Sequence, residues 1–120
     1  MSDKDDLALL IQALKKREQI LINGESVKKY NQYFEVMRKH ARNLFTDNRQ
    51  EELLPYLECD SVSIQRDVAG LLFHCYPEKC EEVLKKIAGM SVETGLPMCF
   101  VNVSISAEMA LEAGIPKEFP

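Results

Sequence analysis

Residues 27 to 44 place apolar side chains three or four positions apart, over about five helical turns. This spacing gathers them on one face of an α-helix and does not fit the alternation of a β-strand. Charged residues, among them Lys28, Lys39 and Arg42, occupy the other face. A helix that is apolar on one side must pack on other elements, so the segment predicts a domain with a shared helical core. Its apolar residues are Val27, Tyr30, Phe34, Met37, Ala41 and Leu44.

A first helix is expected before this segment, with Asp5 or Asp6 as its N-terminal cap. Gly24 supplies the C-terminal signal of that helix, and Ser26 can cap the helix that follows. Residues 46 to 50 are expected to start a third, shorter helix. Its core-facing residues are expected to be Leu53, Leu54 and Leu57.

Residues 62 to 89 predict two helices that meet at Pro77, which suits the first position of a helix. Asp60 or Ser61 can cap the first of them. That helix carries one apolar stripe and a second face on which small residues flank Phe73. We therefore expect it to be buried on two sides, in the middle of the fold. The stripe holds Ile64, Val68, Leu71, Leu72 and Cys75, with Ala69, Gly70 and Phe73 opposite.

The segment from Pro97 to Ala113 alternates like a strand at its start and then becomes strongly helical. No other segment resembles a strand that could pair with it, so one helix is expected there. Residues 114 to 120 are expected to form a tail. A chain of 120 residues has the size of one domain. The sequence thus predicts a single all-α domain with about six helices.

The four cysteines and two histidines are the first candidates for metal or nucleophilic chemistry. Cys75 and Cys80 lack the repeated short spacing of zinc ligands, and both fall on apolar stripes, so we expect them in the core. A catalytic thiol would need one of them to be exposed with a lowered pKa. His74 is expected in a packing or capping role, and His40 in solvent. Without a phosphate loop, nucleophile elbow or paired-histidine motif, no enzyme, cofactor or metal is expected.

Charge is spread unevenly along the chain. Residues 1 to 49 carry a net charge of +3 and residues 50 to 120 a net charge of −7. The acidic half argues against nucleic-acid binding and favours a basic partner, although solubility alone is an equal explanation. No apolar run has the length of a membrane helix, and the acidic opening is unlike a secretory signal. We therefore expect a cytoplasmic protein with reduced cysteines and no membrane partner.

Residues 49 to 89 resemble a HEAT-type repeat. In such repeats a leucine-rich helix runs into a turn that bears an aspartate, and a second helix follows with a Val-x-x-x-Arg pattern and small residues. Residues 77 to 89 and 97 to 113 look like the two helices of a second repeat. The resemblance implies a short, right-handed HEAT-like array. Its residues here are Leu53, Leu54, Leu57, Asp60, Val62, Arg66 and Ala69.

More closely, residues 49 to 113 are similar to a family of short bacterial HEAT-like domains known as a domain of unknown function, number twenty-nineteen in its series. Its pattern has apolar residues where this chain has Cys75 and Cys80, in keeping with core positions for both. These packing motifs concern the fold more than the function. The resemblance implies one helical-repeat domain over residues 1 to 120, with a HEAT-like centre at 49 to 89. The matching segments are Val62–Arg66, Ala69–Leu72, Pro77–Lys79 and Ala107–Leu111.

Small bacterial helical-repeat domains often act as immunity proteins beside toxin genes. The resemblance therefore implies a non-catalytic protein that neutralises a basic toxin, such as a nuclease, by direct binding. An acidic helical face can imitate a phosphate backbone and steer the association. We expect acidic residues around the repeat turns to bind the partner, although Asp60 can be only a cap and Glu78 also suits a first helical turn. The expected residues are Glu58, Asp60, Asp67, Glu78, Glu81 and Glu82.

The alternative function is a helical-repeat scaffold or self-associating adaptor without a toxin partner. A short repeat array leaves apolar surface at its open ends, which can bind another copy or another protein. Leu7, Leu10 and Phe119 are the residues expected on such a surface.

Overall fold

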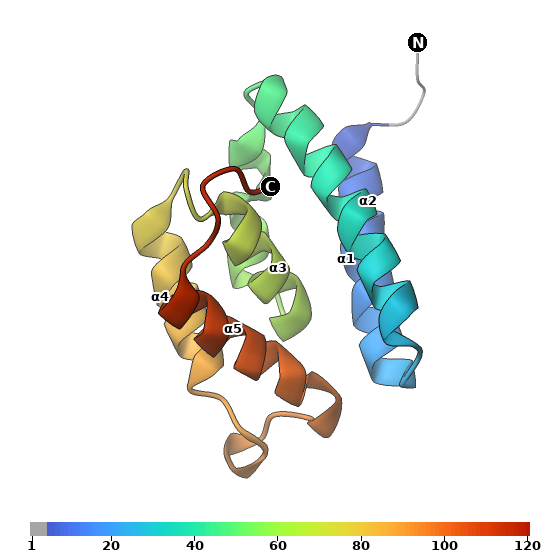
Figure 1. Ribbon diagram of the computed structural model, residues 1–120, viewed down its shortest axis with the longest axis vertical. Coiled ribbons are helices and arrows are strands. Elements are labelled where there is room, and N and C mark those ends of the chain that lie inside the picture. Colours follow the sequence, from blue (N-terminus) through green and yellow to red (C-terminus); the bar gives the residue numbers. More distant parts are fainter. Residues whose placement is uncertain (1–4) are drawn as a thin grey trace.

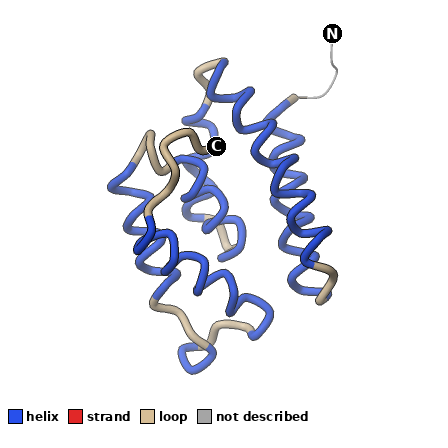
Figure 2. The backbone as a smooth tube through the Cα atoms, in the orientation of Figure 1, coloured by secondary structure: helices blue, strands red, loops and turns tan. Residues whose placement is uncertain are grey.

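The computed structural model describes residues 5 to 120, so the first four residues of the acidic opening lie outside it. Within residues 5–120 every regular element is a helix and none is a strand, which confirms the prediction of an all-α fold (Figures 1 and 2). It consists of α1 (Asp6–Asn23), α2 (Val27–Thr46), the 3-10 helix η1 (Gln50–Glu58), α3 (Val62–Leu72), α4 (Pro77–Ala88), the 3-10 turns η2 (Val92–Thr94) and η3 (Met98–Phe100), and α5 (Val101–Ala113).

The helices α1 and α2 form an antiparallel hairpin along one side of the molecule (Figure 1). The Asp5 carboxylate caps α1 by accepting a hydrogen bond from the backbone N–H of Leu7. Gly24 ends α1 at φ 65°, a left-handed conformation that glycine adopts without strain. The Ser26 hydroxyl then caps α2 by accepting from the N–H of Lys29. The caps and turn that the sequence predicts for the hairpin are confirmed.

The expected third helix is present as the 3-10 helix η1. Pro55 lies inside it, and proline lacks the N–H that an α-helical hydrogen bond requires. Leu53 and Leu57 are buried, as the spacing predicts. Ser61, and not Asp60, caps α3 by accepting from the N–H of Ile64.

The helix α3 lies at the centre of the fold and packs against α1, η1, α4 and α5. Its buried residues run without interruption from Asp67 to Leu72, which covers every side of the helix. The prediction of a helix buried on two sides is therefore confirmed. The core around it is aliphatic, and its largest fully buried members are Leu10, Leu14, Met37, Leu44, Leu53, Leu71, Leu72, Leu84 and Ile87.

The helices α4 and α5 pack on each other beside α3 (Figure 1). Pro77 is the first residue of α4, and Gly89 caps its C-terminus. The expected loop at 90–97 contains the short turn η2, which a Ser91–Thr94 capping box closes. The expected helix from Pro97 begins as the 3-10 turn η3 and continues as α5.

Residues 114 to 120 do not form a free tail. The segment folds back over the molecule and ends between α2 and α3 (Figure 1). The Arg42 Nε donates a hydrogen bond of 2.6 Å to the Pro120 carbonyl oxygen, and Pro120 is buried. The Phe119 ring stacks on Phe34 with 5.8 Å between the ring centroids. This C-terminal segment is thus part of the packed structure.

Candidate interaction surfaces

Five of the six carboxylates that the sequence places at a partner interface are exposed. The sixth, Asp67, has only 7% of its surface exposed and pairs with Arg17 of α1. The prediction that Asp67 lies at the partner interface was wrong, because α3, the central helix that carries it, has no solvent-facing side at that position. The five exposed residues, which we call the acidic edge, are Glu58, Asp60, Glu78, Glu81 and Glu82.

The acidic edge spans two elements, η1 with the turn after it, and α4. Glu58 and Glu82 line one depression of about 340 Å³ between these elements. Its apolar lining comes from Leu54, Leu57 and Val83, and an apolar patch with a charged surround is the usual composition of a protein interface.

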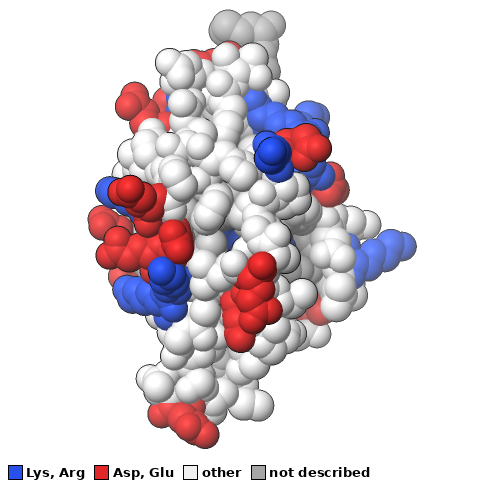
Figure 3. Space-filling view, turned by 60° about the vertical axis from the view of Figure 1, so that its left-hand side comes forward, with Lys and Arg blue, Asp and Glu red and all other residues white. Residues whose placement is uncertain are grey.

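Basic residues interrupt the acidic edge. Lys79 and Lys86 line the same depression, and Lys85 lies 3.2 Å from Glu81. Figure 3 shows acidic side chains grouped on one side of the molecule with basic side chains among them, next to a broad uncharged surface. The surface there is mixed, so any preference for a basic partner depends on the positions of individual carboxylates more than on a uniform field.

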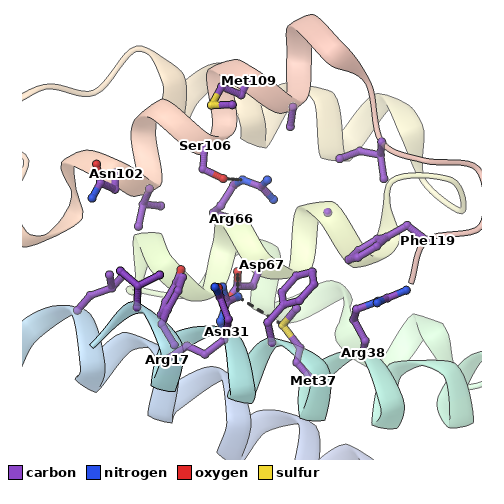
Figure 4. Close-up of a pocket in the computed structure, with 18 of the residues that line it drawn as sticks. Arg17, Asn31, Met37, Arg38, Arg66, Asp67, Asn102, Ser106, Met109 and Phe119 are labelled. Atoms are coloured by element: carbon purple, nitrogen blue, oxygen red, sulfur yellow. Dashed lines mark hydrogen bonds and ion pairs between the residues drawn. The ribbon is translucent and has the colours of Figure 1, made fainter. Parts of the chain in front are cut away.

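A larger hollow, which we call the α2–α5 cleft, has a volume of about 960 Å³. Residues of the α1–α2 hairpin line one side of it, and residues of α3, α5 and the C-terminal segment line the other. Figure 4 shows these side chains converging from the surrounding elements. No pattern in the sequence predicts this cleft.

A buried ion pair lies at the base of the cleft. Arg17 Nη1 of α1 is 2.5 Å from Asp67 Oδ1 of α3, and both side chains are less than a tenth exposed. The Arg17 guanidinium also lies 3.9 Å from the centroid of the Tyr30 ring, a cation–π distance. Burial raises the pKa of the Tyr30 hydroxyl, and the Asp67 charge raises it further. Among the described residues, neither Arg17 Nε nor Asp67 Oδ2 has a hydrogen-bond partner.

Arg66 brings a second guanidinium into the cleft from α3. Its Nε donates to the Ser106 hydroxyl of α5 at 3.0 Å, and it forms no ion pair within the described part of the chain (Figure 4). Gly70 makes room for it, since a Cβ at position 70 would lie 2.9 Å from Arg66 Nη1. Burial lowers the pKa of Arg66, while the neighbouring Asp67 acts in the opposite direction. Arg66 is therefore a partly buried charge whose described side-chain partner is a neutral hydroxyl.

One end of the cleft is closed by aromatic packing. The Arg38 guanidinium lies 5.4 Å from the Phe119 ring centroid and 5.8 Å from that of Phe34. Apolar side chains stand around the open part, where Val27 is 73% exposed and Met109 is 62% exposed. Exposed apolar groups around a concavity are typical of surfaces that bind a partner or a ligand.

The sequence carries a signal for the buried pair. Arg17 follows Leu10 and Leu14 at the spacing of the apolar stripe of α1, and Asp67 follows Ile64 on the stripe of α3. A charged residue at a stripe position predicts burial with an opposite charge, because an isolated charge is not stable in a core. The cleft itself has no such signal, because it arises from how the hairpin meets α5.

The predictions for the thiols were correct for one residue only. Cys80 is buried, and burial raises its pKa to about 11. Cys75 is exposed, because α3 ends at Leu72 and the apolar stripe ends with it. Desolvation still raises the pKa of Cys75, which is opposite to the lowered pKa that a catalytic thiol needs.

Other side chains also differ from expectation. His40, expected in solvent, is partly buried with Nδ1 2.8 Å from Asp6 Oδ1. His74 is exposed, with Nε2 2.7 Å from the Pro116 carbonyl oxygen. Leu10 is fully buried and Phe119 packs on the core, so neither belongs to an exposed apolar end. Within residues 5–120, no three His, Cys, Asp or Glu side chains cluster as metal ligands would.

Comparison of the chain with family models, with curated proteins and with solved structures finds no match. The similarity to the short HEAT-like family therefore stays a prediction. None of the helices among the described residues has the length and apolar character needed to span a membrane.

Proposed function

We propose that this protein is a non-catalytic binding module of the bacterial cytoplasm, and most specifically an immunity protein that neutralises a basic toxin by direct contact. Its partner would be a protein, such as a toxic nuclease, and not nucleic acid or a membrane. The proposed contact surface is the acidic edge, whose carboxylates would meet basic side chains of the toxin and steer the encounter.

The observation that carries the proposal is the meeting of Glu58 and Glu82 at one depression whose lining is part apolar and part charged. These residues come from η1 and α4, which are separate elements, and both side chains are exposed beside it. The predicted resemblance of residues 49 to 113 to short HEAT-like domains, which no comparison tests, is consistent with the same function. Leu54 and Val83 are only half-buried, so a partner that covered the depression would remove apolar surface from water as well as pair charges.

A second candidate function is a self-associating scaffold, and the exposed apolar side chains favour it. Ile105 is 47% exposed and Met109 is 62% exposed on the same helix, four positions apart. Residues at this spacing lie on one helical face, which a second copy could cover. Sedimentation at increasing protein concentration separates the two functions, because the immunity function does not require a dimer.

The test is co-expression with the protein encoded directly upstream, followed by affinity purification and association kinetics. The double variant Glu81→Lys/Glu82→Lys should remain folded, since both side chains are exposed. We expect it to bind the partner more slowly and with a changed dependence on salt. The Glu81–Lys85 pair that it breaks is exposed and contributes little to stability.

A matched control is Glu108→Lys/Glu112→Lys on α5, which changes the net charge by the same amount at exposed positions outside the acidic edge. We expect it to retain the association rate of the unaltered protein more closely than the α4 variant does. Equal effects of the two variants would remove the acidic edge from the interface. Failure of the unaltered protein to form any complex would reject the toxin partner.

A further inference from the structure

We propose that the α2–α5 cleft binds a small amphipathic monocarboxylate, with its carboxylate on Arg66 and its apolar body between α2 and α5. The inference does not rest on a toxin partner. It rests on three properties of the cleft: two guanidinium groups that share one carboxylate at its base, Nη donors of Arg66 that bond to no other described side chain, and an apolar volume with the C-terminal segment at one end.

At the base of the cleft, positively charged side chains outnumber negatively charged ones by one. Arg17 and Arg66 face a single carboxylate, Asp67, and Arg17 takes that carboxylate as its ion-pair partner. The other carboxylates of the lining are engaged or distant from this base: Glu25 pairs with Lys29 at 2.6 Å, and Glu118 is exposed. Arg66 is partly buried, and only its Nε donates to another described side chain, so its Nη groups are free to donate to an anion in the cleft.

The chemistry of the site favours a ligand that carries a single negative charge. The planar fork of a guanidinium matches a carboxylate, which accepts two parallel hydrogen bonds. One negative charge balances the excess of one positive charge, whereas a dianion such as a phosphate monoester would be repelled by the buried Asp67. Ser106, which already accepts from Arg66 Nε, fixes the plane of the guanidinium for a ligand.

The apolar part of the cleft selects the body of the ligand. The volume of about 960 Å³ lies at the upper end of the range of about 300–1,000 Å³ that is usual for small-molecule sites. Tyr30, Phe34 and Met109 supply aromatic and aliphatic lining. An aromatic ring or an alkyl chain would be taken out of water there.

The closed end favours a compact ligand over a partner helix that runs through the cleft. Phe119 stacks on Phe34 across this end, and the Arg42 hydrogen bond to Pro120 holds the segment in place. A helix lying in the groove would meet the C-terminal segment within a short distance. A ligand with an anionic head and an apolar body fits between Arg66 and the open part near Val27 and Met109.

The test is a titration of the full chain with naphthylacetate and with decanoate, followed by amide NMR. The neutral analogue naphthylacetamide has the same ring without the charge and serves as the ligand control. We expect saturable binding of both acids, with the largest shifts around Gly70 and Ser106. We expect the amide to bind at least roughly ten-fold more weakly, the loss usual for a hydrogen bond to a charged group.

Two protein variants locate the site. Arg66→Met should weaken naphthylacetate binding by roughly ten-fold or more, while Lys39→Met, which removes an exposed charge of α2, should not. Met109→Glu places a negative charge, which repels the ligand carboxylate, at the open part of the cleft, where Met109 is exposed. It should weaken binding more than Met109→Lys does, because both variants remove the same apolar side chain and differ in the sign of the charge. This second pair decides the question even if Arg66→Met fails to fold.

Each outcome is decisive. Saturable binding that depends on the carboxylate, on Arg66 and on the charge at position 109 supports the proposal. Absence of binding by both acids overturns it, as does equal binding of naphthylacetate and its amide. Shifts confined to other parts of the molecule also overturn it. None of these results depends on the upstream-encoded protein, so they are independent of the immunity function.

Discussion

Arg17 and Asp67, fifty positions apart in the sequence, form a buried ion pair with 2.5 Å between Nη1 and Oδ1. The pair joins the α1–α2 hairpin to the central helix α3. Because both charges are removed from water, neither can lose its partner without leaving an uncompensated charge in the interior. The hairpin and the α3–α5 half of the fold are thus tied together by a contact that does not tolerate single substitutions.

Asp67→Asn should lower the free energy of unfolding by about 3–5 kcal/mol, because it leaves the Arg17 charge buried and unpaired. The double variant Arg17→Met/Asp67→Leu should recover most of that loss, since apolar residues of similar volume can replace a buried pair. Urea unfolding of the single and double variants measures both effects. A single variant that costs less than about 1 kcal/mol would show that the pair behaves like an exposed one.

The thiols of Cys75 and Cys80 should react with a thiol reagent under different conditions. Cys75 is exposed, whereas Cys80 is fully buried with its pKa raised to about 11. We expect an aromatic disulfide reagent to modify Cys75 in the native protein and Cys80 only after denaturation. The variant Cys75→Ser serves as the control, and it should lose the native-state reaction attributed to that thiol. Modification of Cys80 at the same rate in native and denatured protein would contradict its position in the core.

The free energy of unfolding should fall in acid, because the Asp6 carboxylate at the start of α1 becomes protonated. Hydrogen bonds from Asn43 and His40 lower the pKa of Asp6 below its ordinary value of 3.8. A carboxylate whose pKa is lower in the folded state contributes stability above its unfolded pKa, and loses it as the pH falls through the folded value. Asp6→Asn should therefore flatten the decline in unfolding free energy between roughly pH 5 and pH 2.

The control for this prediction is Glu93→Gln, which removes an exposed carboxylate on η2. It should leave the acid limb of the stability curve close to that of the unaltered protein. If the free energy of unfolding falls equally in acid for the Asp6 variant and for the unaltered protein, the hydrogen bonds of Asp6 to Asn43 and His40 contribute nothing to folding.

The C-terminal segment should contribute to stability. Phe119→Ala removes the ring that stacks on Phe34 and should cost about 1–3 kcal/mol, less than for a fully buried phenylalanine because Phe119 is half-buried. Lys117→Ala, at an exposed position of the same segment, should have little effect. Thermal unfolding of the two variants provides the comparison. Equal melting temperatures would mean that the segment is not packed.

Local patterns in the sequence predicted the helices well. The apolar stripe of 27 to 44, the caps Asp5, Ser26 and Ser61, and Pro77 each depend on neighbouring residues, so their effects can be recognised without knowing the fold. The two-sided burial of α3 also followed from its own sequence. These features account for the elements and their order.

The surfaces could not be predicted in the same way. Asp67 is buried because α1 packs against α3 beside it, and the C-terminal segment is held by the hydrogen bond from Arg42, far away in the sequence, to Pro120. The α2–α5 cleft depends on the separation between the hairpin and α5. Such properties come from the packing of distant segments, which helical periodicity does not encode.

The most direct test of the proposed function is a growth assay in cells that express the protein encoded directly upstream. Each strain carries this chain, the Glu81→Lys/Glu82→Lys variant, or neither. The immunity function predicts arrested growth with the neighbour alone, rescue by the unaltered chain, and weaker rescue by the variant. Normal growth with the neighbour alone, or arrest that the unaltered chain does not relieve, would contradict the immunity function.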